Sequence, residues 1–402
     1  MDAVREAGSD ELGEAVSASR VRSVTQLRDL VRPWLVGVGA VPRHGAEGCR
    51  ARTGRRPGVA SVWLVKAVLQ DRYGAVSGLH LAEVPEPRIG PDEVLVAVRA
   101  ASVHPDVWHV VTGRPAVLRL MGAGLRAPRQ PVPGTDFAGQ VMAVGDEVTT
   151  VAVGDAVFGE SVPSMQWVNG ATYAERVSVR SDRLLPMPAA ISYVEAATLP
   201  TSGIIALQSV RDNGRVRTGD RVLVNGASGG VGMLSVQIAR ADGATVTAVD
   251  AADKQDLLRS IGADHCIDFM SEDFTAAETR YDVVVDIPGN RSFAEIRRVL
   301  ASHGTYVLVG HDQYGREGRA VLGSIPRFAR LMARSPLSDQ LPPVSFTSRP
   351  KQEYLRELRD LVEAGHLRPV IDRTYPLEQA AAAIDHLASG RARGRVVIEV
   401  RP

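Results

Sequence analysis

The sequence predicts an α/β protein in which a doubly wound parallel sheet is inserted into a β-rich domain. Three observations predict this class. Short β segments without long helices between them follow residue 65, strands alternate with helices after residue 189, and a β segment closes the chain at residues 395–400. Alternating strands and helices are typical of a parallel sheet with right-handed crossovers. The closing strand is expected to rejoin the first domain.

The changes in the pattern of expected strands and helices divide the 402 residues into three parts. Residues 1–64 keep no strand or helix pattern, and we expect either a poorly ordered extension or sequence ahead of the true start. Residues 65–188 and 343–402 are assigned to the β-rich domain, and residues 189–342 to the α/β domain. A cleft between two such domains is a common place for a binding site.

Each expected element rests on a short apolar pattern between glycine and proline turns. The expected strands of the β-rich domain cover residues 66–70, 79–84, 93–101, 136–144 and 395–400, with a helix over 377–386. The expected strands of the α/β domain cover residues 221–225, 245–250, 281–286 and 304–309, with helices over 233–241, 254–261 and 293–300. An amphipathic helix is expected within residues 316–343, and β character near residue 341.

The composition excludes several classes of function. A hydrophobic content of 45% and a formal net charge of +1 are typical of a soluble globular protein. The charges form no basic stripe and no apolar run approaches the roughly 20 residues that cross a bilayer, so neither nucleic acid nor membrane is an expected partner. Two cysteines, Cys49 and Cys266, are too few for a disulfide framework. A cytoplasmic protein with a small-molecule substrate is expected.

The strongest motif is a glycine-rich turn between the strand at residues 221–225 and the following helix. Ala227, Gly229 and Gly232 occupy the three positions of the G-x-G-x-x-G pattern. Small residues let the backbone approach a pyrophosphate, whose charge is met by free N–H groups and the positive end of the helix. The predicted cofactor-binding residues of this turn are Gly226, Ala227, Ser228, Gly229, Gly230, Val231 and Gly232.

An acidic residue ends the next strand, as dinucleotide binding requires. Asp250 follows 18 residues after Gly232, where a carboxylate can accept hydrogen bonds from the adenosine ribose. A carboxylate also repels a 2′-phosphate, so NAD is slightly favoured over NADP. Lys254 and Arg259 lie nearby and are either phosphate ligands or solvated helix residues. The predicted cofactor is NAD(P)H, with Asp250 and Lys254 among its binding residues.

Segments on both sides of this turn resemble the medium-chain dehydrogenase/reductase superfamily, over nearly all of residues 65–402. The matching segments are ASVHPDVW at 101–108, PGTDFAG at 133–139, VGDAVFG at 153–159, ATYAE at 171–175, LPTSG at 199–203, GADH at 262–265, YDVVVD at 281–286 and VLVG at 307–310. The resemblance implies a GroES-like catalytic domain around a Rossmann domain, similar to quinone oxidoreductases. It also suggests a homodimer.

The positions of the superfamily's zinc ligands decide which chemistry to expect. Where zinc alcohol dehydrogenases have cysteine, histidine and cysteine, this sequence has His104, Thr135 and Thr201. Two hydroxyls and one imidazole are a poor set for Zn²⁺, so no metal is expected. Without zinc, reduction of a quinone or an activated C=C bond is favoured, because one or two hydrogen bonds can stabilise the developing charge on oxygen.

The expected catalytic residues are His104 and Tyr173. His104 replaces an asparagine common in similar quinone reductases and is either a hydrogen-bond donor to the substrate carbonyl or a core imidazole. Tyr173 is expected to lie near the nicotinamide or to pack within the sheet. Thr201 faces the nicotinamide or caps a helix, and the backbone of Gly310 is expected at the nicotinamide side. Asp106, Trp108 and His109 are expected on the loop that follows His104, as candidates to line the pocket. His104 and His109, five residues apart across a proline, form no defined helical face for a metal.

These residues predict an NAD(P)H-dependent oxidoreductase that transfers hydride to a quinone or an α,β-unsaturated carbonyl without zinc. One alternative is a zinc-free alcohol or aldehyde reductase, which needs a side-chain acid to protonate an alkoxide. Another is a non-catalytic NAD(P)-binding redox sensor that kept the fold. No motif in the sequence identifies the physiological substrate.

Overall fold

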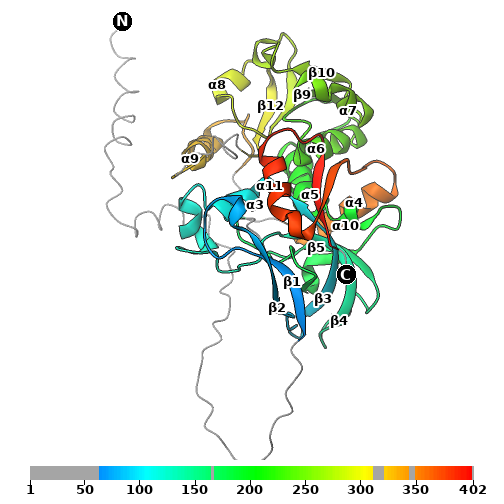
Figure 1. The fold of residues 1–402 in the computed structure, drawn as a ribbon. Helices are drawn as coiled ribbons and strands as arrows, with labels where there is room; N and C mark the ends of the chain where they lie inside the picture. The colour runs from blue at the N-terminus through cyan, green and yellow to red at the C-terminus, as the bar shows by residue number, and fades with distance from the viewer. Residues whose placement is uncertain (1–62, 164–166, 311–320, 344–348, 401–402) are drawn as a thin grey trace, which may run out of the picture. The chain divides into compact units, whose positions relative to one another are not determined.

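The computed structural model describes residues 63–163, 167–310, 321–343 and 349–400. Nearly all of the expected extension, and the first residues of the expected amphipathic helix, lie outside this part. The described strands form a five-stranded parallel sheet, a seven-stranded sheet and a two-stranded ribbon (Figure 1). None of the described helices is long and apolar enough to cross a membrane.

The parallel sheet has the strand order β10-β9-β8-β11-β12. Its central strands are apolar runs buried on both faces, as helices on both sides of a parallel sheet require. The order changes direction between β8 and β11, which opens a crevice at the carboxyl ends of the strands. The strands are β8 (Arg221–Asn225), β9 (Thr245–Asp250), β10 (His265–Asp268), β11 (Tyr281–Asp286) and β12 (Leu300–Leu308).

One helix of this part, α5, precedes the parallel strands in sequence, and the other three lie between them. They are α5 (Pro200–Leu207), α6 (Gly230–Ala241), α7 (Gln255–Ser260) and α8 (Phe293–Ile296). The helix predicted over 293–300 ends at Ile296, and the strand predicted from residue 304 already begins at Leu300. Tyr281 N donates to Val299 O at 2.7 Å, so the chain already pairs with β11 before Leu300 and ends the helix there.

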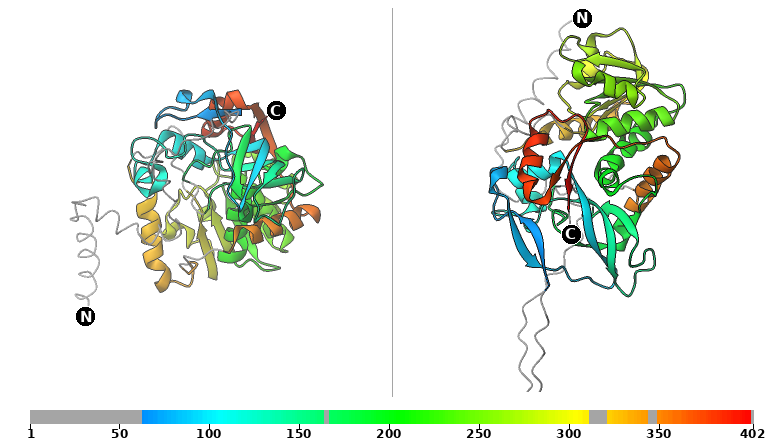
Figure 2. Two further views of the ribbon diagram at one scale, coloured as in Figure 1. Left: turned by 90° about the horizontal axis from the view of Figure 1, so that it is seen from below. Right: turned by 45° about the vertical axis from the view of Figure 1, so that its right-hand side comes forward.

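The β-rich part contains both ends of the described chain. The closing strand β14 pairs antiparallel with β3, and Val396 lies opposite Val103. In Figures 1 and 2 β3 is drawn in the blue-to-cyan colours of the early chain and β14 in the red of the C-terminus, although the two strands lie side by side. The fold class is therefore confirmed. The strands are β1 (Leu64–Leu69), β2 (His80–Pro85), β3 (Glu93–Val103), β4 (Asp136–Val144), β5 (Ala156–Glu160), β6 (Arg176–Arg180), β7 (Leu184–Pro186), β13 (Ile371–Pro376) and β14 (Arg395–Glu399).

Two further predictions of secondary structure were wrong. The loop expected after His104 is the helix α3 (Pro105–Thr112), because proline at the first helical position is preorganised to start a helix. The β character expected near residue 341 is not found among the described residues around it. They hold helices α9 (Ile325–Arg334) and α10 (Lys351–Glu363), and β13 comes later. A last helix, α11 (Ala380–Ala388), precedes β14.

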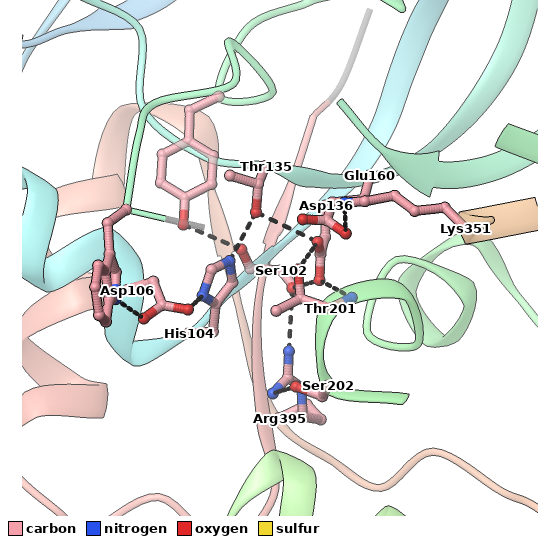
Figure 3. A network of polar contacts seen from close by, with 12 residues as sticks. Ser102, His104, Asp106, Thr135, Asp136, Glu160, Thr201, Ser202, Lys351 and Arg395 are labelled. Carbon is pink, nitrogen blue, oxygen red and sulfur yellow. Dashed lines mark hydrogen bonds and ion pairs between the residues drawn. The ribbon is translucent and has the colours of Figure 1, made fainter. Parts of the chain in front are cut away.

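Helix α10 was missed although its apolar residues have helical spacing. Tyr354, Leu355, Leu358, Leu361 and Val362 are all buried. They belong to the same core cluster as the apolar residues of α5, β8 and β9. The helix therefore packs against the nucleotide-binding half, and Lys351, its first residue, reaches toward the sheet of the other half (Figure 3).

Candidate active site

The glycine turn follows β8 and forms a cradle at the start of α6. Gly226 has φ +77°, and its N–H donates to Val249 O at 3.0 Å. A Cβ atom at Gly232 would lie 2.3 Å from Gly226 O, so only glycine fits there. The N-cap of α6, Gly229, has no side chain to bind the first N–H groups of the helix. This cradle fits the pyrophosphate of a dinucleotide.

Replacing Gly232 with alanine is expected to weaken NADH binding at least about tenfold, which corresponds to about 1.4 kcal/mol. The added Cβ meets backbone atoms of Gly226 and Ala227, so the turn itself must move. Titration of NADH fluorescence measures the effect. Gly78→Ala is the control, because a Cβ there meets nothing within 4 Å. Unchanged affinity in Gly232→Ala would show that the turn does not hold the cofactor.

Asp250 connects the end of β9 to the glycine turn. Its Oδ2 accepts a hydrogen bond from Ser228 N at 2.8 Å, and the residue is only 7% exposed. Lys254 Nζ lies 3.5 Å from Asp250 Oδ1. Arg259 instead pairs with exposed Asp256, as a solvated helix residue does. The structure thus brings Asp250 and Lys254 to the turn, and leaves Arg259 outside it.

A second centre is Asp136, the first residue of β4, which is fully buried. Its carboxylate accepts hydrogen bonds from Ser102 Oγ at 3.2 Å, Thr135 Oγ1 at 3.3 Å and Thr201 N at 3.1 Å. The Thr201 hydroxyl also donates to it (Figure 3). The alternative of Thr201 as a helix cap is wrong, because α5 begins at Pro200 and the Thr201 hydroxyl is used by Asp136.

His104 lies between β3 and α3 and is 2% exposed. Its Nε2 is 2.8 Å from Thr135 Oγ1, and its Nδ1 is 3.5 Å from Asp106 Oδ2. The second contact has the distance of an ion pair rather than of a good hydrogen bond. Asp106 is itself fixed, since its Oδ1 accepts from Trp167 Nε1 at 3.0 Å. Imidazole, carboxylate and hydroxyl groups thus meet in one buried row.

The charges around this row favour a protonated imidazole. Burial by itself lowers the pKa of His104, but contact with Asp106 and the charge of Asp136 outweigh it, so the pKa is raised above the ordinary 6.5. Burial raises the pKa of Asp106, but the contact with His104 and the hydrogen bond from Trp167 more than offset it, so the pKa of Asp106 is lowered. The pair therefore stabilises an imidazolium beside a carboxylate.

Tyr173 lies next to this row but is fully buried in the core of the β-rich part. Its hydroxyl donates to Ser102 O at 3.1 Å. Burial, together with the charge of Asp136, raises the pKa of Tyr173. These contacts favour the packing role among the two that the sequence left open. The Tyr173 ring also packs against Gly134, which directly precedes Thr135 and Asp136 in the sequence.

Arg395 is a site residue that sequence reasoning missed. It begins β14, is 6% exposed, and donates to Ser202 Oγ at 2.7 Å and to Ser102 Oγ at 3.1 Å. A Cβ atom at Gly230 would lie 1.8 Å from the nearest guanidinium nitrogen, so the cation touches the first residue of α6. The one signal in the sequence that could have indicated Arg395 is its position as a charged first residue of an otherwise apolar closing strand.

Within the described part of the chain, the hydrogen-bond partners of this buried cation are two hydroxyl groups and no carboxylate. Among the described residues its Nε has no hydrogen-bond acceptor. Burial lowers the pKa of Arg395, and the charge of Asp136 partly offsets this. Arginine nevertheless remains charged in proteins, and an incompletely paired buried charge is costly. A cation of this kind beside the glycine turn is suited to an anionic group.

Contacts connect the cofactor turn to His104 without a gap. Gly230 touches Arg395. Arg395 binds Ser102, Ser102 binds Asp136, and Asp136 binds Thr135, which contacts His104 (Figure 3). Gly310 follows β12 on the cofactor edge of the parallel sheet. A Cβ there would lie 2.8 Å from Ile287 O, next to the loop after β11. The arrangement can hold a dinucleotide at one end and polarise an oxygen atom at the other.

The residues at the zinc positions do not fit a metal ion. His104 Nε2 and Thr135 Oγ1 are 2.8 Å apart and bind each other, which leaves no room for an ion between them. The Thr201 hydroxyl donates to Asp136. Throughout the described residues, no three His, Cys, Asp or Glu side chains are placed to hold a metal ion. We therefore derive no step through zinc.

Comparison with known proteins identifies the family. The alcohol dehydrogenase GroES-like domain matches residues 90–189, and the zinc-binding dehydrogenase family matches residues 261–398. The chain is 28% identical to a chloroplast envelope quinone oxidoreductase homolog of Arabidopsis thaliana, over 84% of this chain and 98% of that protein. It is 30% identical to 2-methylene-furan-3-one reductase of Solanum lycopersicum, over 84% and 80% of the two chains.

Solved structures agree with these sequence relatives. The quinone oxidoreductase from Coxiella burnetii superimposes with a TM-score of 0.70 at 28% identity, over 84% of this chain and all of that one. The shared fold includes the nucleotide-binding sheet and the β-rich domain. The chain therefore belongs to the medium-chain dehydrogenase/reductase superfamily, as a nicotinamide-dependent oxidoreductase related to its quinone oxidoreductases.

Proposed function

We propose that the protein reduces quinones or α,β-unsaturated carbonyl compounds with NAD(P)H and without zinc. The observation that carries this proposal is the hydrogen bond between His104 and Thr135, at the place where zinc alcohol dehydrogenases bind their metal. The names of the Arabidopsis and tomato relatives support acceptors of these two kinds. We also propose a cytoplasmic location, which follows from the low cysteine content rather than from the fold.

The chain's own residues would hold the cofactor and polarise the acceptor. NAD(P)H, when bound, supplies a hydride. Arg395 and the first N–H groups of α6 bind its pyrophosphate, Asp250 binds the adenosine ribose, and Thr201 and Gly310 line the nicotinamide side. The row formed by His104 and Thr135 donates a hydrogen bond to the acceptor oxygen, whose negative charge grows during the reaction. Burial of both side chains strengthens that interaction.

Conjugated acceptors fit this site better than simple aldehydes. Hydride addition to an enone or a quinone spreads the new charge over a conjugated system, so hydrogen bonds are sufficient. Reduction of an isolated carbonyl gives a basic alkoxide that needs a stronger electrophile. Incubation with an enone separates the two reactions, because the first yields a saturated ketone and the second an allylic alcohol. Allylic alcohol as the main product would contradict the proposal.

We propose that NADH is the preferred cofactor. Asp250 is fixed at the turn by Ser228, so its carboxylate repels a 2′-phosphate. Asp250→Asn keeps an acceptor for Ser228 N but removes the charge, and should shift the ratio of kcat/KM for NADH over NADPH about tenfold toward NADPH. Asp256→Asn, at an exposed carboxylate on α7, is the control. A wild-type enzyme that prefers NADPH would contradict this assignment.

A further inference from the structure

Three side chains form a row at the site where relatives with zinc hold the metal. Asp106 faces His104 Nδ1 at 3.5 Å, and His104 Nε2 contacts Thr135 Oγ1 at 2.8 Å (Figure 3). We propose that the Thr135 hydroxyl delivers the proton that completes reduction, and that His104 resupplies it while Asp106 holds the imidazolium. This inference rests on the proposed reductase function and adds the path of the proton.

The placement of His104 explains why the hydroxyl is the delivering group. Both ring nitrogens face protein groups, Nδ1 toward Asp106 and Nε2 toward Thr135, and the residue is 2% exposed. The imidazole can therefore pass a proton to a substrate only through Thr135. A hydroxyl is suited to this, because it can accept one hydrogen bond while it donates another.

The hydrogen of the Thr135 hydroxyl is held only weakly by Asp136, and the side chain is buried like that of His104, at 1% exposed. In the structure the hydroxyl donates to Asp136 Oδ1 at 3.3 Å, which is the longest of the four hydrogen bonds that Asp136 accepts from Ser102, Thr135 and Thr201. Asp136 keeps the other three when Thr135 turns away. The buried carboxylate then remains satisfied, so the rotation costs little.

The proton balance of the step is simple for an enone. Hydride adds to the β-carbon, and the C=C electron pair moves to give an enolate. The Thr135 O–H bond breaks as a new O–H bond forms on the enolate oxygen, and the proton on His104 Nε2 moves to Thr135. The enol becomes the saturated ketone, and after it leaves, water returns a proton to Nε2 through the same hydroxyl. One NAD(P)H and one proton are consumed.

The charged groups around His104 are placed to hold this proton. Asp106 on α3 and Asp136 on β4 are acidic, Arg395 on β14 opposes them, and Glu160 on β5 is paired with Lys351 on α10. Burial lowers the pKa of His104, and so does the charge of Arg395, but contact with Asp106 and the charge of Asp136 outweigh both, so the pKa is raised. Turnover should therefore fall as pH rises through this pKa, because the relay loses its proton.

The test compares four variants by turnover, by NMR and by the pH dependence of turnover. Thr135→Val should lower kcat at least about 100-fold, the usual contribution of general acid catalysis, while Thr135→Ser stays within a few-fold of wild type. Thr150→Val, at an exposed threonine, is the control. Thr135→Val should also lower the pKa of His104 measured by NMR without cofactor, because the imidazolium loses its acceptor. Asp106→Asn should move the falling limb of the pH profile to lower pH.

Each outcome bears on the relay. Wild-type turnover by Thr135→Val would overturn the relay and leave the reductase function standing, with water as the proton source. A uniform loss of activity at every pH in Asp106→Asn, with no movement of the limb, would also overturn it and indicate a structural role. If the wild-type protein reduces no quinone or enone, the proposed function fails and the relay fails with it.

Discussion

Replacing Arg395 with methionine is expected to raise the Kd for NADH by about 10- to 100-fold. The guanidinium touches Gly230 at the start of α6, and its two hydrogen bonds go to the hydroxyls of Ser202 and Ser102. A charge-assisted hydrogen bond contributes about 1.5–3 kcal/mol, and each 1.4 kcal/mol is about tenfold in affinity. Methionine keeps much of the volume and removes the charge.

Two further variants make this result specific. Arg393→Met removes an exposed arginine two residues earlier, which pairs with Asp253, and should leave the Kd unchanged. Arg395→Lys keeps the charge without the planar fork, and should fall between wild type and Arg395→Met. Fluorescence titration with NADH measures all three. Equal affinity of Arg395→Met and wild type would mean that the buried cation does not face the pyrophosphate.

Replacing Lys351 with methionine is expected to lower the free energy of unfolding by about 3–5 kcal/mol. Lys351 Nζ on α10 binds the carboxylate of Glu160 on β5 and donates to Val162 O at 2.8 Å. Glu160 is fully buried, and its second oxygen has no hydrogen-bond partner among the described residues. Without Lys351 a carboxylate remains buried without its cation, which is why the single change is so costly.

The loss should depend on pH in a defined direction. Burial raises the pKa of Glu160, with the charge of Asp136 adding to it, and Lys351 opposes the shift. In Lys351→Met the pKa of Glu160 rises further, so the folded state holds the proton more tightly than the unfolded state. The loss of stability in Lys351→Met is therefore complete at a pH above the pKa of Glu160 in the folded state. It becomes smaller as the pH falls from that pKa toward the pKa of Glu160 in the unfolded state.

Urea unfolding at several pH values measures this effect. The double variant Lys351→Met with Glu160→Gln should recover much of the stability, because no buried charge is left. Lys66→Met, at an exposed lysine of β1, controls for the loss of a lysine. A deficit that is independent of pH, or a double variant less stable than Lys351→Met, would contradict the role given to the pair.

The nucleotide-binding half could be predicted closely from the sequence. Strands β8, β9 and β11 begin and end at the predicted residues. They are apolar on both faces, and their signal is local, as is that of the glycine turn and Asp250. The same holds for β4, at residues 136–144. In these elements a short window of sequence contains the physical cause; α3 and α10 also have local signals, a first-turn proline and helical apolar spacing, but were missed.

The missed contacts of the buried cations depend on residues far apart in the chain. Arg395 meets Ser102 across 293 positions, and Lys351 meets Glu160 across 191. No local pattern indicates that a buried cation will find those partners. The role of Tyr173 is similar, because its hydroxyl position depends on the strand that carries Ser102. Only the folded arrangement shows which hydroxyls, imidazole and carboxylates lie together.

The most direct measurement is oxidation of NADH and NADPH by the purified protein after its metal content has been determined and removed with a chelator. A panel of quinones, enones, ketones and aldehydes should show turnover of quinones or enones that the chelator leaves unchanged, with NADH preferred. The predicted result follows from His104 and Thr135 bonded to each other at the zinc position. Activity that disappears with the chelator and returns with zinc, or that occurs only with simple ketones and aldehydes, would contradict metal-free reduction of a conjugated acceptor.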